Sequence, residues 1–154
     1  MSVEIHSDGA CLGNPGRGGY GVILSSGGKV RELSGGFSLT TNNHMELMAA
    51  IVGLETLSRS CKVLLVTDSK YVIEGIDKGW AKAWRANGWR KADKKPALNT
   101  DLWQRLLEQC DRHEVGFKWV RGHTGIPENE RCDELAKAAA LAGGLPEDPG
   151  YAGA

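Results

Sequence analysis

The sequence predicts an α/β fold, and three patterns in its first half predict it. Residues 3–8 alternate between apolar and polar side chains, as a half-buried strand does. Residues 43–58 follow a helical pattern with one broad apolar stripe. Residues 62–67 form a nearly continuous apolar run, which is typical of a strand buried on both faces. A strand, a helix and a buried strand in succession indicate a parallel crossover unit and therefore an α/β sheet.

The remaining elements of the first half form a hairpin. Residues 18–24 and 29–33 have strand character, and the Ser-Gly-Gly sequence at 26–28 is a turn signal between them. The glycines at 35–36 and the polar run at 40–43 end this region.

The second half continues the alternation of helices and strands. We expect a short helix over 70–77, a helix opening near Thr100, an alternating strand over 114–120 and a helix over about 128–141 that Gly143 stops.

Composition indicates one globular domain. The chain has 154 residues, of which 41% are hydrophobic and 25% charged, and it shows no internal repeat. We expect a single domain over residues 1–142, followed by a Gly/Pro/Ala-rich flexible tail over 143–154.

Net charge, cysteine spacing and hydropathy limit which kinds of partner, metal site and location the sequence predicts. The net charge is zero, so attraction to a nucleic acid must come from a local patch. The four cysteines include no C-x-x-C pair, which argues against a metal–thiolate site and favours reduced thiols in a cytosol. The N-terminus enters a strand at once, and no apolar run approaches the roughly 18 residues of a membrane span. We therefore expect a cytoplasmic protein with no membrane association, monomeric by default.

Three acids stand where a sheet brings segments together. Asp8 follows the first strand and precedes a glycine-rich loop, Glu46 lies near the start of the first helix, and Asp68 follows the buried strand. Acids beside apolar strands need partners to remain charged. Open α/β sheets place ligand sites at the carboxyl ends of their strands. We expect these carboxylates to converge around a metal ion.

Each of these acids also has an ordinary structural explanation. Glu46 could form a capping box with Asn43, Asp68 could cap the short helix after it, and Asp8 could stabilise the glycine turn.

Two further candidates, Asp133 and His123, have ordinary explanations as well. Asp133 has Lys137 four residues later, which is the spacing of a helix-surface ion pair, and His123 between two glycines could be a surface histidine.

Taken together, converging carboxylates would repel one another unless a cation joined them. Oxygen ligands with no sulfur suit Mg²⁺, with Mn²⁺ as a substitute. Two such ions about 3.5–4 Å apart would activate a water and stabilise the leaving oxygen of a phosphodiester. A loop histidine could then move protons or help product leave.

Residues 80–96 combine three tryptophans with six cations and one acid. The ordinary alternative is a solvated helix packed by tryptophans. The excess of positive charge favours a surface that binds successive phosphates along a nucleic-acid strand.

At these residues the sequence resembles bacterial type 1 ribonuclease H. The matching motifs occur in order over nearly the whole chain up to the tail: Asp8-Gly9, the Asn42–Leu47 run, Thr67-Asp68-Ser69, Gly122–Gly125 and Asn129–Asp133. The resemblance implies a ribonuclease H-like fold, with a five-stranded mixed sheet of three antiparallel and then parallel strands, flanked by helices. It also implies Mg²⁺-dependent hydrolysis of the RNA strand of RNA–DNA hybrids, leaving 5′-phosphate and 3′-hydroxyl ends.

The resemblance assigns roles by motif. It implies metal-binding catalytic carboxylates at Asp8, Glu46, Asp68 and Asp133, with His123 assisting turnover. Asn14 and Asn42 match positions that contact the RNA strand near its 2′-hydroxyls, and Thr41 and Asn99 match a pocket for a DNA phosphate. The remaining substrate-binding candidates form a basic protrusion: Trp80, Trp84, Lys82, Arg85, Arg90, Lys91, Lys94 and Lys95.

The chain departs from the family pattern at three positions. Relatives commonly carry arginines where this chain has Leu39 and His44, and often a glutamine where it has Lys70. Two alternatives stay open: a non-catalytic hybrid-binding module, and another nuclease or transferase on the same fold. A single-strand DNA-binding protein is a possible partner that the sequence leaves open.

Overall fold

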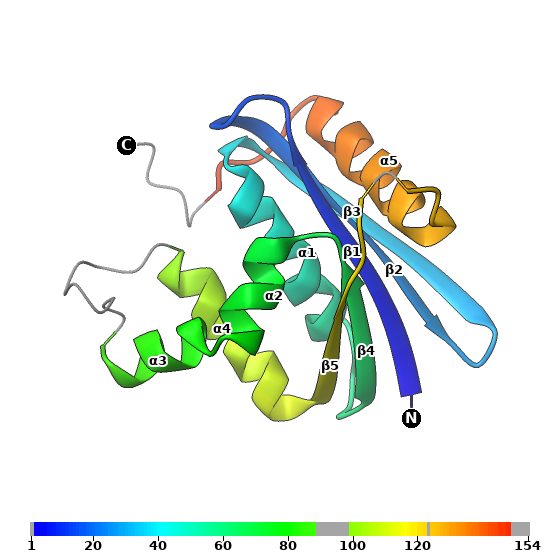
Figure 1. Cartoon of the computed structure of the whole chain (residues 1–154). Helices are drawn as coiled ribbons and strands as arrows, with labels where there is room; N and C mark the ends of the chain where they lie inside the picture. The colour runs from blue at the N-terminus through cyan, green and yellow to red at the C-terminus, as the bar shows by residue number, and fades with distance from the viewer. Residues whose placement is uncertain (1, 89–98, 123, 149–154) are drawn as a thin grey trace.

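The computed structural model describes residues 2–88, 99–122 and 124–148. A five-stranded mixed sheet with strand order β3-β2-β1-β4-β5 lies at its centre (Figure 1). β1 pairs antiparallel with β2 and β2 antiparallel with β3, whereas β4 runs parallel to both β1 and β5. The mixed sheet implied by the resemblance is therefore confirmed. The strands are β1 (Ser2–Cys11), β2 (Gly16–Ser26), β3 (Lys29–Thr40), β4 (Lys62–Thr67) and β5 (Glu114–Trp119).

Helices cover both faces of this sheet. α5 packs over β1, β2 and β3 on one face, and α1 packs over β1 and β2 on the other, with α4 against α1 (Figure 1). Glycines allow the close approach: a Cβ at Gly21 would overlap the Cys132 carbonyl of α5, and one at Gly53 of α1 would crowd Ile5. The helices are α1 (Asn42–Glu55), α2 (Lys70–Asp77), α3 (Trp80–Ala86), α4 (Thr100–Arg112) and α5 (Pro127–Leu141).

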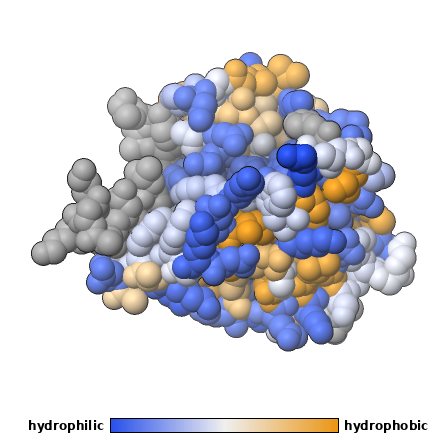
Figure 2. All heavy atoms as spheres, viewed as in Figure 1, coloured by the Kyte–Doolittle hydropathy of each residue, from blue (hydrophilic) through white to orange (hydrophobic). Residues whose placement is uncertain are grey.

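The hydrophobic core lies between the sheet and the layer of α1 and α4. Ile5, Leu65, Trp103 and Leu106 are fully buried there, and Gly75 of α2 lies against the Trp103 ring. On the face seen in Figure 2, hydrophilic residues dominate and hydrophobic residues appear in separate patches. None of the described helices is both long and apolar enough to cross a membrane.

Several element ends differ from the sequence predictions. β3 continues to Thr40 because Gly35 and Gly36, expected to end the hairpin, pair with β2. α1 begins at Asn42 and ends at Glu55. Its N-cap is Thr41, whose hydroxyl accepts the His44 N–H over 3.3 Å, so the capping box with Asn43 is wrong.

The second helix is also capped by a different residue. The prediction of α2 over 70–77 is confirmed, but Ser69 rather than Asp68 is its N-cap, because the Ser69 hydroxyl accepts the Val72 N–H over 3.2 Å. Asp68 is therefore not engaged as that cap.

Residues 143–148, the described part of the expected flexible tail, make specific contacts, and residues 149–154 lie outside the described residues. Residues 143–148 return toward the end of β3, where the Ser38 N–H donates to the Pro146 carbonyl over 2.8 Å. Asp148 is buried and binds Thr40 and His44. These contacts are specific polar interactions that composition alone does not reveal.

Candidate metal and nucleic-acid site

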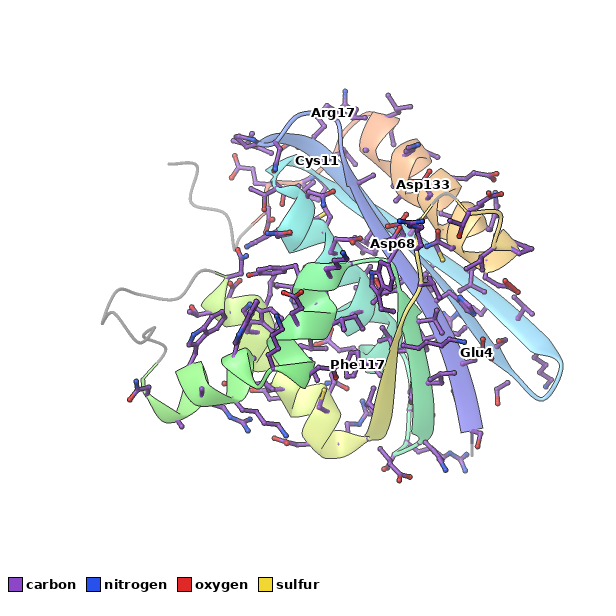
Figure 3. All side chains as sticks on the ribbon, viewed as in Figure 1. Glu4, Cys11, Arg17, Asp68, Phe117 and Asp133 are labelled. Carbon is purple, nitrogen blue, oxygen red and sulfur yellow. The ribbon has the colours of Figure 1, made fainter. Side chains whose placement is uncertain are left out.

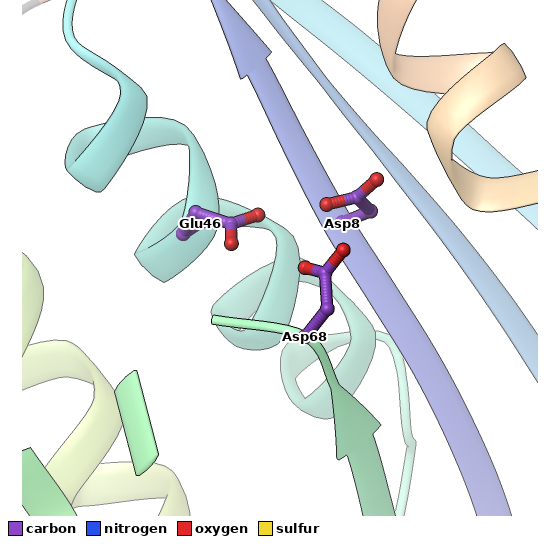
Figure 4. A group of neighbouring side chains, drawn as sticks. All are labelled: Asp8, Glu46 and Asp68. Carbon is purple, nitrogen blue, oxygen red and sulfur yellow. The ribbon is translucent and has the colours of Figure 1, made fainter. Parts of the chain in front are cut away.

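Three elements bring three carboxylates together. Asp8 lies on β1, Glu46 on the first turns of α1, and Asp68 directly after β4 (Figure 4). The parallel register pairs Ser7 with Thr67, so the acids that follow them emerge at the same edge of the sheet. One ligand oxygen from each of the three carboxylates lies within 4.8 Å of the others. The predicted convergence of these three acids is therefore present in the structure.

Glycine allows α1 to bring Glu46 close to Asp8. A Cβ at Gly9 would overlap the backbone of Met45 and Glu46, so the helix and β1 meet closely only because Gly9 has no side chain. The Gly9 N–H donates to the Glu46 carboxylate and also to the Asp8 carboxylate, the latter over 2.9 Å. Main-chain hydrogen bonds therefore orient two of the three acids.

Asp68 is oriented by two other segments. The Trp119 indole N–H donates to the Asp68 main-chain carbonyl over 3.0 Å. Gly122 lies so close that a Cβ there would crowd the Asp68 carboxylate. The end of β5 and the loop after it therefore form one wall beside this acid.

Burial and mutual repulsion disfavour ionisation of the group. Asp8 and Glu46 are each 5% exposed. Burial is the main cause that raises the pKa of Asp8 above 3.8, and the charges of Glu46 and Asp68 raise it further. Burial followed by the Asp68 charge raises the pKa of Glu46 above 4.5. A bound cation would favour the charged forms of Asp8 and Glu46, and carboxylate oxygens are the ligands that hard divalent ions prefer.

Asp133 lines the same pocket but is not one of the three acids that lie within 4.8 Å of one another (Figure 3). Its carboxylate lies 2.9 Å from the Lys137 ammonium, and this contact raises the pKa of Lys137. The ion pair considered as its ordinary explanation is therefore present. Because Asp133 still lines the pocket, its role as a metal ligand remains a prediction.

The two asparagines expected to contact RNA lie together. The Asn42 N–H donates to the Asn14 side-chain oxygen over 3.1 Å, which joins the β1–β2 loop to the start of α1. Both residues are exposed, and Asn42 lines the pocket of the carboxylates. Thr41 directly precedes Asn42, and its hydroxyl is engaged as the helix cap.

A second polar cluster contains Asn99. Asn99 has a left-handed backbone (φ 58°) and its side-chain N–H donates to the Tyr71 hydroxyl over 3.0 Å. The Trp103 indole N–H donates to the same hydroxyl over 3.0 Å. Tyr71 and its neighbour Lys70 line the carboxylate pocket. No sequence pattern singles out Tyr71, because its contacts with Asn99 and Trp103 depend on how α2 packs beside α4.

The described part of the basic segment is α3. Trp84 meets the edge of Trp103 with ring centroids 6.2 Å apart and so packs against the core, and Trp80 stacks on Trp84 with centroids 6.3 Å apart. Lys82 is exposed, and Arg85 lies 3.3 Å from Asp111. Five predicted residues lie outside the described residues: Arg90, Lys91, Lys94, Lys95 and His123.

Known proteins share the sequence and the fold. The RNase H family model matches residues 1–141. A ribonuclease H from Desulforamulus reducens is 61% identical over 95% of this chain and 92% of its own length. One from Syntrophus aciditrophicus is 58% identical over 97% of this chain and 86% of its own length. The crystal structure of LC9-RNase H1, a type 1 RNase H with the type 2 active-site motif, superposes with a TM-score of 0.80 at 32% identity and covers 97% of this chain and 78% of that one. The chain therefore belongs to the bacterial type 1 ribonuclease H family.

Proposed function

We propose that this ribonuclease H cleaves the RNA strand of RNA–DNA hybrids internally, with divalent metal at the carboxylates, leaving 5′-phosphate and 3′-hydroxyl ends. The observation that carries the proposal is the convergence of Asp8, Glu46 and Asp68 from three separate elements. Clustered carboxylates would repel the phosphates of a nucleic acid, so a protein that only binds nucleic acid would gain nothing from them. Such carboxylates have value where cations act on a phosphodiester.

The donor set supports Mg²⁺, with Mn²⁺ as a substitute. The ligand atoms are carboxylate oxygens, which hard divalent cations prefer, and the described cluster contains no thiolate or imidazole. Bound there, the cations would lower the pKa of an attacking water and stabilise negative charge on the leaving 3′-oxygen. Asp8, Glu46 and Asp68 would hold them, and Asp133 is proposed as a further ligand at the pocket wall.

The side chains around the carboxylates would choose and align the substrate. The amides of Asn14 and Asn42 offer donors and acceptors for 2′-hydroxyls, the group that distinguishes RNA from DNA. The ammonium of Lys70 lies in the same pocket and can contact a backbone phosphate. In-line attack of water breaks the bond between phosphorus and the 3′-oxygen, so the phosphate stays on the 5′ end of the released fragment.

The test is cleavage of four labelled substrates of one sequence: RNA–DNA hybrid, duplex RNA, single-stranded RNA and duplex DNA. Each is incubated with Mg²⁺ and with EDTA, and Asp8→Asn serves as the inactive control. We expect internal cuts only in the RNA strand of the hybrid, only with metal, and 5′-phosphate ends on the products. Binding of the hybrid without cutting in Mg²⁺ or Mn²⁺ would instead indicate a recognition module, and cutting of duplex DNA would indicate another nuclease on this fold.

A further inference from the structure

A buried polar cluster joins the C-terminal segment to the beginning of α1. The Asp148 carboxylate accepts the Thr40 hydroxyl over 2.6 Å and lies 2.8 Å from the His44 Nδ1. The side chains of His44 and Asp148 are 2% and 1% exposed. If the Asp148 carboxylate were removed, the buried Thr40 hydroxyl and the His44 ring would each lose a hydrogen-bond partner.

The segment before Asp148 reaches this cluster along β3. Pro146 accepts the Ser38 N–H, and Leu145 lies beside Gly36. At the start of the segment, Arg17 donates to the Ala142 carbonyl. Residues 142–148 therefore form a strap that follows the edge of the sheet toward the nucleic-acid side of the molecule.

The two partners of Asp148 flank two of the proposed substrate contacts. Thr40 is the last residue of β3 and His44 lies in the first turn of α1. Thr41 and Asn42 stand between them, and Asn42 in turn holds the Asn14 side chain. A single carboxylate thus connects both ends of the short segment that presents Thr41 and Asn42.

The acids of the metal site have separate supports. Glu46 is held by Gly9, and its helix is packed on β1 through Gly53. Asp68 is held by Trp119 on the opposite side of the site. Loss of the strap should therefore disturb recognition of the substrate more than the geometry of the carboxylates.

We propose that Asp148 is a positioning residue for hybrid recognition, acting through Thr40 and His44 on the segment that carries Thr41 and Asn42. The inference rests on the proposed function for its substrate. It assigns the C-terminal strap a part in substrate affinity, in addition to any contribution to stability.

The experiment compares Asp148→Ala, Asp148→Asn and a control variant of matched stability, all in the full chain with Mg²⁺. Val63→Ala is the control, since Val63 is 3% exposed near the start of β4, far along the strand from Asp68. We expect Asp148→Ala to raise KM for the hybrid about 5–10-fold while kcat changes less than about 2-fold. Asp148→Asn keeps one acceptor oxygen and should give a smaller rise.

Two readouts without turnover accompany the kinetics. The amide NMR resonance of Asn42 should shift in Asp148→Ala and stay in place in Val63→Ala. Mg²⁺ affinity, measured by calorimetry, should be the same in all three variants. A KM equal to that of the control, or a loss confined to kcat, would overturn the positioning role. If the unmodified protein does not cut the hybrid, the proposed function fails instead, which is a distinguishable result.

Discussion

The Trp119 indole N–H donates to the main-chain carbonyl of Asp68 over 3.0 Å. Trp119 ends β5 and Asp68 directly follows the neighbouring strand β4, so β5 holds the segment that carries this acid. The same indole ring lies beneath the Lys70 ammonium at 5.2 Å, within the range of a cation–π contact. Trp119 therefore contacts both an acid of the carboxylate cluster and a lysine that lines the same pocket.

Trp119→Phe is expected to slow turnover without abolishing it. The phenyl ring can still lie under Lys70, but the donor to Asp68 is lost, and we expect kcat to fall about 2–5-fold. Lys70→Gln is the control, because it removes the cation and leaves the indole hydrogen bond. It should change KM rather than kcat, and steady-state kinetics on the hybrid would show this. An unchanged kcat in Trp119→Phe would mean that the hydrogen bond does not orient Asp68.

Asp8→Asn is expected to stabilise the metal-free protein, increasingly so as the pH rises. Burial and neighbouring acids raise the pKa values of Asp8 and Glu46 in the folded chain. Above the ordinary carboxyl range the folded chain then holds more protons than the unfolded chain, so the free energy of unfolding falls as pH increases. Replacing Asp8 by Asn removes one of these acids, so the free energy of unfolding should fall less steeply with pH.

Thermal unfolding in EDTA between about pH 5 and pH 8 measures this effect, and we expect Asp8→Asn to melt about 3–8 °C above the parent protein at the upper end. Saturating Mg²⁺ should narrow the gap, because cations relieve the same repulsion in the parent. Parallel pH profiles for the two proteins would contradict the assigned repulsion.

Lys82 and Arg85 should differ in their contribution to hybrid binding. Lys82 is exposed on α3, whereas the Arg85 guanidinium is engaged with Asp111. If α3 binds phosphates of the hybrid, Lys82→Ala should reduce the magnitude of the slope of log K for hybrid binding against log salt concentration by about 1. Arg85→Ala should reduce it less. Fluorescence anisotropy with a labelled hybrid in EDTA over a salt series provides the comparison, and equal slopes in both variants would rule out this division of roles.

Lys137→Gln should make the metal site easier to fill. The Lys137 ammonium lies 2.9 Å from the Asp133 carboxylate and adds positive charge near Asp8, so it would compete with a cation bound by Asp133. We expect the Mg²⁺ concentration for half-maximal activity to fall about 2-fold. Lys118→Gln on β5 makes the same charge change at an exposed position and is the control. The same shift in both variants would show a general charge effect rather than competition at Asp133.

Much of this arrangement follows from local patterns. The apolar run of β4 and the helical stripe before it predict a parallel crossover, and the parallel pairing of β1 with β4 then places Asp8 and Asp68 at one edge of the sheet. The glycine-rich loop and the position of Glu46 near a helix start are likewise visible in the sequence. These features depend on side-chain periodicity and strand direction, which neighbouring residues determine.

The tertiary structure alone decided which distant partners the polar groups take, whereas the Asp133–Lys137 pair and the Ser69 cap of α2 are contacts between residues close in sequence. Asp133 lies next to Lys137 at the pocket wall, outside the group of three acids, and Asp148 reaches His44 across 104 residues of chain. Serine rather than aspartate caps α2, and the Asp68 carboxylate lies with those of Asp8 and Glu46. The place of Asp133 outside the three acids and the contact of Asp148 with His44 depend on distances between packed elements, and close packing determines those distances to within the length of a hydrogen bond. Local sequence preferences do not determine contacts between residues that are distant in the chain.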